Sequence, residues 1–168
     1  MSQDLSFPIG SMFVRESSRR YRQATAAEVL EAAREAIEKH FTRGIKMTDP
    51  AATRRYLCAT MAMLERETFR VLLLDSQHQL LAAVDVSVGT LDAAAVYPRE
   101  VVKLGLQHNA AAAIFAHQHP SGIPEPSSAD RLLTERLKQA LALVDVRVLD
   151  HFVIGGNSVT SFAERGWI

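Results

Sequence analysis

Several features that define common protein classes are scarce in this chain of 168 residues. Its single cysteine, Cys58, excludes an intramolecular disulfide framework and a zinc site built from paired thiolates. Lys plus Arg and Asp plus Glu both number 19, so the formal net charge is zero, which excludes a strongly basic module that binds nucleic acid through bulk charge. No apolar run approaches the ~20 residues that span a bilayer, and the N-terminal residues lack the apolar segment of a secretory signal. We therefore expect a cytoplasmic protein without a membrane partner.

What is present is the composition of an ordinary globular protein, with 48% hydrophobic and 23% charged residues. The length suits one domain with a short appendage. We assign the appendage to residues 1–64, as a polar arm followed by two helices, and the domain to residues 65–168, where apolar segments become strand-like. The arm, residues 1–23, is expected to be loosely ordered.

Two capping patterns predict where the N-terminal helices begin. Thr25 and Glu28 have the spacing of a capping box, in which each side chain accepts a hydrogen bond from the backbone N–H of the other residue. This first helix should end near Phe41. Asp49 followed by Pro50 is typical of an N-cap and a first helical residue, so a second helix should begin there.

The rest of the chain mixes strands and helices without strict alternation, which favours an α/β fold with a mixed, largely antiparallel sheet and flanking helices. Apolar runs of strand length, turn residues between them and capping residues indicate the individual elements. Strands are predicted over residues 69–74, 80–88, 110–116, 144–149 and 151–154, and helices from Pro98 to about Asn109 and from Ser127 or Ser128 to about Leu143.

Two histidines, His117 and His119, come directly off one of these predicted strands. Side chains two positions apart on a strand share a face at about 6–7 Å, so the two imidazoles can converge on one metal ion. Asp130 follows in the first turn of the next helix, and a loop that folds back can bring its carboxylate to the same ion. Two histidines and one aspartate leave one position of a tetrahedral zinc ion for water, as in catalytic zinc sites. Bound zinc lowers the pKa of that water to near 7.

A hydrolytic site of this kind also needs a group that moves protons and a donor for the oxyanion. A carboxylate that does not bind the metal can carry the proton. Spacing alone leaves four candidates open: Glu65, Glu67, Glu100 and Glu125. Ser127, at a helix start, could donate its hydroxyl to the oxyanion. Ser127 and Asp130 also have the spacing of a helix-capping pair, which is compatible with both roles.

The pattern His117-x-His119, followed after seven residues by Ser127-x-x-Asp130, resembles the JAMM motif of MPN-domain metalloproteases. The wider sequence resembles the RadC family, which shares the HxHPSG core found at residues 117–122. Other RadC-like blocks occur in the same order over about residues 65–168: E-x-F-x-V-L-x-L-D from Glu67 to Asp75, G-T-L-x-x-x-x-V-x-P-R-E from Gly89 to Glu100, and L-D-H-F-V-I-G from Leu149 to Gly155.

The resemblance implies a JAMM/MPN-like fold with a layout similar to that of cytidine deaminases. It also implies a zinc-dependent metallopeptidase or isopeptidase. By position, His117, His119 and Asp130 match the zinc ligands. Glu67 matches the glutamate that works through the metal-bound water, and Ser127 matches the serine that stabilises the oxyanion.

Two features depart from the usual family pattern. Gln118 takes the place of an asparagine between the histidines, at a position that should face away from the metal. Residues 25–64 lack an evident helix-hairpin-helix region, which RadC-like proteins usually carry, and resemble the shorter prophage-type members. The expected partner is a peptide or isopeptide substrate. The alternatives are a DNA-repair-associated accessory module and an inactive MPN-type interaction scaffold.

Some conspicuous side chains fit simpler interpretations. His151 is expected in the core or beside a metal ligand rather than as a ligand itself. An arginine cluster in the arm is expected to be a solvated surface, with a weak nucleic-acid contact as the alternative: Arg15, Arg19, Arg20 and Arg22. The absence of a second cysteine excludes a zinc nucleoside deaminase. An apolar helical hairpin permits an oligomer without requiring one.

Overall fold

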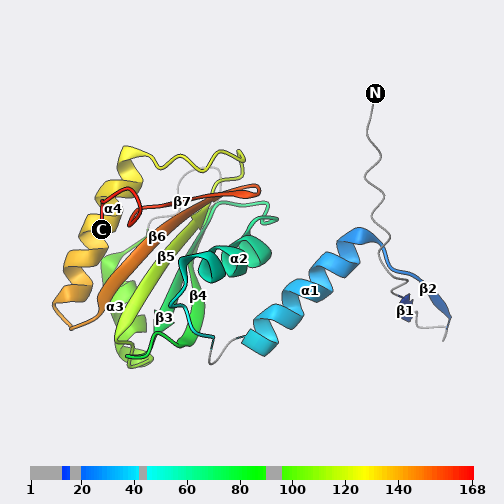
Figure 1. Cartoon of the computed structure of the whole chain (residues 1–168), viewed down its shortest axis with the longest axis horizontal. Coiled ribbons are helices and arrows are strands. Elements are labelled where there is room, and N and C mark those ends of the chain that lie inside the picture. Colours follow the sequence, from blue (N-terminus) through cyan, green and yellow to red (C-terminus); the bar gives the residue numbers. More distant parts are fainter. Residues whose placement is uncertain (1–12, 16–19, 42–44, 90–95) are drawn as a thin grey trace.

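The computed structural model in Figure 1 describes residues 13–15, 20–41, 45–89 and 96–168. Expectations that involve residues 1–12, 16–19 or 90–95 lie outside this part of the chain, as do those on the side chains of Arg15 and of residues 36–41. The described residues form a five-stranded sheet, a two-stranded antiparallel pair near the N-terminus and the helices α1 to α4. No helix in these ranges combines the length and the apolar composition that crossing a membrane requires.

The centre of the fold is a mixed sheet with the strand order β4-β3-β5-β6-β7. The strands are β3 (Thr68–Leu74), β4 (Leu80–Val88), β5 (Ala112–Gln118), β6 (Arg147–Gly155) and β7 (Ser158–Ser161). β5 pairs antiparallel with β3 on one side and parallel with β6 on the other, and the outer pairs are antiparallel. The expected α/β class, with a mixed and largely antiparallel sheet of the JAMM/MPN type, is confirmed.

The central strands β3 and β5 are buried along their whole length because their side chains alternate between two cores. On β3, Leu72 and Leu74 face one core, and Val71 and Leu73 face the other. The first core lies under α2 (Pro50–Met61), and the second lies under α3 (Pro98–Gln107) and α4 (Ser128–Ala142). The result is a three-layer arrangement in which the sheet separates α2 from α3 and α4 (Figure 1).

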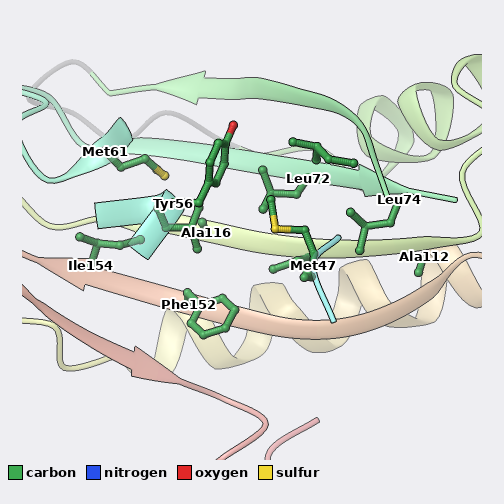
Figure 2. Packing of buried hydrophobic residues seen from close by; sticks show 12 residues of the cluster. Met47, Tyr56, Met61, Leu72, Leu74, Ala112, Ala116, Phe152 and Ile154 are labelled. Atoms are coloured by element: carbon green, nitrogen blue, oxygen red, sulfur yellow. The ribbon is translucent and has the colours of Figure 1, made fainter. Parts of the chain in front are cut away.

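Helix α2 is an integral part of the first core. Figure 2 shows Tyr56 and Met61 of α2 packed among side chains of β3, β5 and β6, with Met47 closing the same cluster. Leu57, also on α2, has no exposed surface. The predicted domain boundary after residue 64 stays a prediction, and a chain shortened to test it would lose these core side chains.

The N-terminal segment contains more structure than the sequence suggested. Strands β1 (Phe13–Arg15) and β2 (Tyr21–Gln23) pair antiparallel, so the expectation of a loosely ordered arm is wrong for these residues. Aromatic residues such as Phe13 and Tyr21 favour extended, paired backbone. Helix α1 (Ala26–Phe41) follows, and in Figure 1 it and the hairpin lie beside the sheet rather than on either face of it.

The capping box at the start of α1 is present. The Glu28 N–H donates to Thr25 Oγ1 at 3.3 Å, and the Thr25 N–H donates to Glu28 Oε2 at 2.9 Å. Asp49 likewise caps α2 by accepting hydrogen bonds from the N–H groups of Ala51 and Ala52. These local patterns therefore placed both helix starts correctly.

The C-terminal strands differ from expectation in two ways. Residues 144–149 and 151–154 were predicted as separate strands, but the structure has the single strand β6, which begins after a turn at Asp145 with φ of 59°. Strand β7 was missed because it is only four residues long. The dipeptide Gly156-Asn157 was the available signal, since such pairs form two-residue hairpin turns and Gly156 has φ of 56°.

We predict that Leu57→Ala lowers the free energy of unfolding by about 2–5 kcal/mol, the usual cost of a cavity in a core. Leu106→Ala on α3 is the matched control, because Leu106 is 56% exposed and surface truncations usually change stability by only about 0.5 kcal/mol. Urea unfolding of both variants measures the difference. Equal losses would contradict the assignment of α2 to the core.

Candidate metal centre

Three candidate ligands meet where β5 ends and α4 begins. His117 is the penultimate residue of β5, His119 lies just beyond the strand, and Asp130 is in the first turn of α4. His117 lies on the same side of β5 as Phe115, which belongs to the core under α4. One ligand atom from each of the three residues lies within 4.8 Å of the others. The sequence therefore identified a group of side chains that the fold does bring together.

The distances within this group suit a small divalent cation. His117 Nε2 lies 2.8 Å from His119 Nε2 and 3.4 Å from Asp130 Oδ1, and His119 Nε2 lies 4.0 Å from Asp130 Oδ2. Ligands bound tetrahedrally to zinc at 2.0–2.1 Å are about 3.3 Å apart. The two imidazoles would separate by about half an ångström to hold such an ion. Two imidazole nitrogens and a carboxylate are also ligand types that zinc accepts.

The orientation of His119 is set by the loop that follows it. Its Nδ1 lies 2.9 Å from the carbonyl oxygen of Ile123. A carbonyl can only accept, so Nδ1 carries a proton, and in the neutral ring Nε2 is then the nitrogen with the lone pair that faces His117. This pairing of a ligand histidine with a backbone carbonyl is the usual way of fixing the tautomer at metal sites.

Gly155, at the end of β6, allows that loop to pass close to the sheet. A Cβ atom at this position would lie 2.5 Å from Pro124 N and 2.6 Å from Ile123 C. Glu125, further along the loop, forms two hydrogen bonds with Arg165 of the C-terminal tail, at 2.6 and 2.7 Å. The loop is thus held between the end of the sheet and the tail.

Asp130 combines a structural role with its place in the cluster. Ser127 and Asp130 form the capping box of α4: Asp130 Oδ2 accepts from the Ser127 N–H and hydroxyl, both at 2.7 Å, and Ser127 Oγ accepts from the Asp130 N–H. Partial burial raises the pKa of Asp130, but the interaction with His117 in its protonated form and the two Ser127 donors outweigh it and hold the pKa well below its ordinary value. Asp130 is therefore a carboxylate at neutral pH.

A third histidine, His151 on β6, lies behind His117. Its Nε2 is 2.9 Å from His117 Nδ1, and its Nδ1 is 2.6 Å from the hydroxyl of Thr134 on α4. The ring is fully buried against Phe69, Phe115 and Phe162. This burial lowers the pKa of His151 well below its ordinary value, so the ring is neutral.

The expectation that His151 lies in the core is confirmed, and the ring also contacts the candidate ligand His117. Sequence reasoning missed Thr134. The available signal was its position one helical turn after Asp130, which places the two side chains on the same face of α4.

The four candidate proton carriers differ in their surroundings. Glu125 is paired with Arg165, and Glu100 with Lys103 at 3.0 Å. Glu67 immediately precedes β3, whose first residue pairs with Gln118, so Glu67 stands across from His119 in the antiparallel register. Its exposed side chain makes no hydrogen bond or ion pair with the described residues. Glu65 is also exposed but lies two residues further from the paired strands.

Gln118 points to the other side of the sheet. Its Nε2 donates to the Leu64 carbonyl oxygen at 3.0 Å, and its side chain is buried. The position between the two histidines therefore serves the contact between β5 and the segment after α2. This agrees with the expectation that the Gln118 side chain faces away from the candidate metal ligands.

The family model of the RadC-like JAB domain matches residues 47–167 of this chain. The chain belongs to the RadC family. The match begins before α2, in agreement with the contribution of that helix to the core. The JAB domain is a hydrolase-type fold, and members are typically metal-dependent, which fits the His-His-Asp group found here.

Curated relatives carry a family designation rather than an activity. A UPF0758 protein of Vibrio cholerae serotype O1 is 55% identical over 141 residues, which cover 84% of this chain and 89% of that protein. UPF0758 proteins of Aeromonas hydrophila and Tolumonas auensis are 51% and 54% identical over 89% and 83% of the chain. These two are longer, and the aligned part covers only 66% and 62% of them.

We predict that Gly155→Ala displaces the loop after His119, because the new methyl group would overlap the Ile123–Pro124 backbone. Overpacking of this kind usually lowers stability by about 1–3 kcal/mol. Gly105→Ala on α3 is the control, since its Cβ would make ordinary contacts of 3.6 Å and alanine favours a helix. Thermal unfolding and the structure of the loop in each variant are the measurements. An unmoved loop and unchanged stability in Gly155→Ala would contradict this account.

Proposed function

We propose that this RadC family member is a zinc-dependent hydrolase of amide bonds, acting on a peptide or isopeptide. The observation that carries the proposal is the convergence of His117, His119 and Asp130 on one point, where β5 ends and α4 begins. The fit of this group to zinc rests on ligand type and on separations close to those of a tetrahedral site. When bound, zinc would act as a Lewis acid and make a water molecule acidic enough to react at neutral pH.

In this proposal Glu67 moves the proton. Its carboxylate stands across from His119 in the strand register and makes no hydrogen bond or ion pair with the described residues, so an oxygen of Glu67 is available to accept the proton of the attacking water. The same oxygen then delivers that proton to the leaving amine, which completes the cleavage of the amide. The engagement of Glu100 and Glu125 with cationic side chains supports the choice of Glu67 over them.

Ser127 is proposed to donate its hydroxyl to the oxyanion that forms on the attacked carbonyl. A hydroxyl has one proton, and in the structure it is directed to Asp130 Oδ2 at 2.7 Å. The proposed role therefore requires this proton to turn from the carboxylate to the substrate. Because the Asp130 N–H still donates to Ser127 Oγ, the cap can persist while the proton changes acceptor.

The nucleic-acid partner stays a weaker proposal. Arg22, one of the arginines that motivated it, donates to both oxygens of Glu28, at 2.8 and 2.5 Å, so part of the positive charge of the arm is neutralised locally. No described contact favours the inactive-scaffold alternative, since all three candidate ligands are present. An oligomer is likewise a prediction without a described interface.

We predict that the metal-free protein takes up one zinc ion per chain. His117→Ala with His119→Ala should abolish this uptake by removing two of three protein ligands. His78→Ala with His108→Ala is the matched control, because it removes two histidines that lie outside the cluster. Elemental analysis after zinc reloading gives the stoichiometry. Full zinc retention in the first double variant would exclude the site.

We predict that Glu67→Gln keeps zinc and fold but lowers turnover by about 10²–10⁴-fold, the usual contribution of an acid–base group. Ser127→Ala should lose less, about 10²–10³-fold for one oxyanion donor. Glu65→Gln is the matched control and should retain wild-type turnover. A library of peptides and isopeptides supplies the substrate. Wild-type turnover by Glu67→Gln would contradict the mechanism, and the absence of any amide cleavage by zinc-loaded protein would contradict the proposed activity.

A further inference from the structure

We infer that Thr134 and His151 form a hydrogen-bond relay that fixes the tautomer of His117, so that His117 presents an unprotonated Nε2 to the metal. The relay runs through three side chains on three different elements, α4, β6 and β5. His151 and Thr134 are positioning residues in this account, because they act through His117. The inference rests on the metal site of the proposed function, but its central claim concerns proton positions in the protein itself.

The direction of the relay follows from counting protons along it. The Thr134 hydroxyl lies 2.6 Å from the backbone carbonyl oxygen of Asp130 and 2.6 Å from His151 Nδ1. A carbonyl has no proton to give, so the hydroxyl proton must go to Asp130 O. If the hydroxyl proton were directed to His151 instead, the Thr134 oxygen and the Asp130 carbonyl oxygen would face each other at 2.6 Å without a proton between them. The hydroxyl oxygen therefore accepts from His151, and Nδ1 of His151 is the protonated nitrogen.

The same count fixes the next two steps. A neutral imidazole has one N–H, so a proton on His151 Nδ1 leaves Nε2 as an acceptor. That nitrogen lies 2.9 Å from His117 Nδ1, which must then be the donor. With its proton on Nδ1, His117 presents the lone pair of Nε2 toward His119 and Asp130. The tautomer of this ligand is thus set at the carbonyl of Asp130, the residue that also supplies the carboxylate.

In the described part of the chain, the ring of His151 has only Thr134 and His117 as side-chain hydrogen-bond partners. The ring has no exposed surface and is enclosed by Phe69, Phe115 and Phe162, whose centroids lie 4.6–5.8 Å away. None of these rings accepts or donates a conventional hydrogen bond. Asp150, the adjacent acidic residue, directs its carboxylate to the backbone N–H of His151, to Ser161 and to Ala163. Thr134 is therefore the partner that decides which nitrogen of His151 is protonated.

With both rings neutral, the proposed tautomers place no proton between the atoms of His117, His119 and Asp130 that face one another. His119 holds its proton on Nδ1 for Ile123 O, and the relay holds that of His117 on Nδ1 for His151. Both Nε2 lone pairs then point into a contact of 2.8 Å, with the Asp130 carboxylate beside them. Three acceptors without a donor repel one another unless a cation lies between them.

The test compares Thr134→Val with Thr134→Ser. Valine keeps most of the side-chain volume but removes the hydroxyl, whereas serine keeps the hydroxyl and removes the methyl group. We expect zinc affinity, measured by competition with a chelator, to fall about 10–100-fold in Thr134→Val, as is typical when a partner of a ligand histidine is lost. Thr134→Ser should bind zinc almost as tightly as the wild type. A purely structural role would instead make affinity follow the loss of packing in both variants.

The second readout is the tautomer of His151 in the metal-free wild-type protein. Two-bond ¹H–¹⁵N correlation of the histidine rings should show Nδ1 protonated and Nε2 unprotonated. Protonation at Nε2, or equal zinc affinity in Thr134→Val and wild type, overturns the relay while the metal site stands. Failure of the wild type to bind zinc, with His151 protonated at Nδ1, overturns the proposed function instead. If Thr134→Val does not fold, the wild-type spectrum alone decides.

Discussion

The contact of 2.8 Å between the Nε2 atoms of His117 and His119 is the constraint on which the arrangement of the site depends. Such a contact is unfavourable between two lone pairs, so the surrounding structure has to hold the rings in place. His117 stands on β5, which is hydrogen-bonded on both sides, to β3 and to β6. His119 is held by the carbonyl of Ile123, in a loop that passes close to Gly155. The paired strand and the loop thus hold the two Nε2 atoms close to each other.

Asp130 links this position to the start of α4. One carboxylate oxygen completes the capping box with Ser127, the other faces His117, and the backbone carbonyl accepts from Thr134. The stability of α4 and the geometry of the three candidate ligands therefore depend on the same residue. A substitution at Asp130 would remove both the helix cap and one candidate ligand, so its effect could not be assigned to either of them. Substitutions of Thr134 and Gly155 are easier to interpret, because the side chain of Thr134 contacts His151 and Gly155 contacts the loop that orients His119.

The strands on either side of β5, which are β3 and β6, position Glu67 and His151. The antiparallel pairing of β3 with β5 puts Phe69 opposite His117, and this register carries Glu67 to the position across from His119. The parallel pairing of β5 with β6 puts His151 beside Phe115, one step from His117 on the same face. The site is therefore assembled at the edge where the ends of β5 and β6 meet the beginning of β3. Residues outside the strands and helices supply His119, the carbonyl that orients it, and the side chains of Glu67 and Ser127.

The sequence by itself determined what depends on residues a few positions apart. The capping boxes at Thr25 and Ser127, the apolar run of β3 and the shared face of His117 and His119 are local patterns, because they involve neighbours in the chain. The proton positions were decided only by the tertiary structure. His117 and His151 are 34 residues apart, and Thr134 and His151 are 17 apart. Which ring nitrogen carries a proton depends on the partner that the fold places beside it, and no spacing within the chain encodes that partner.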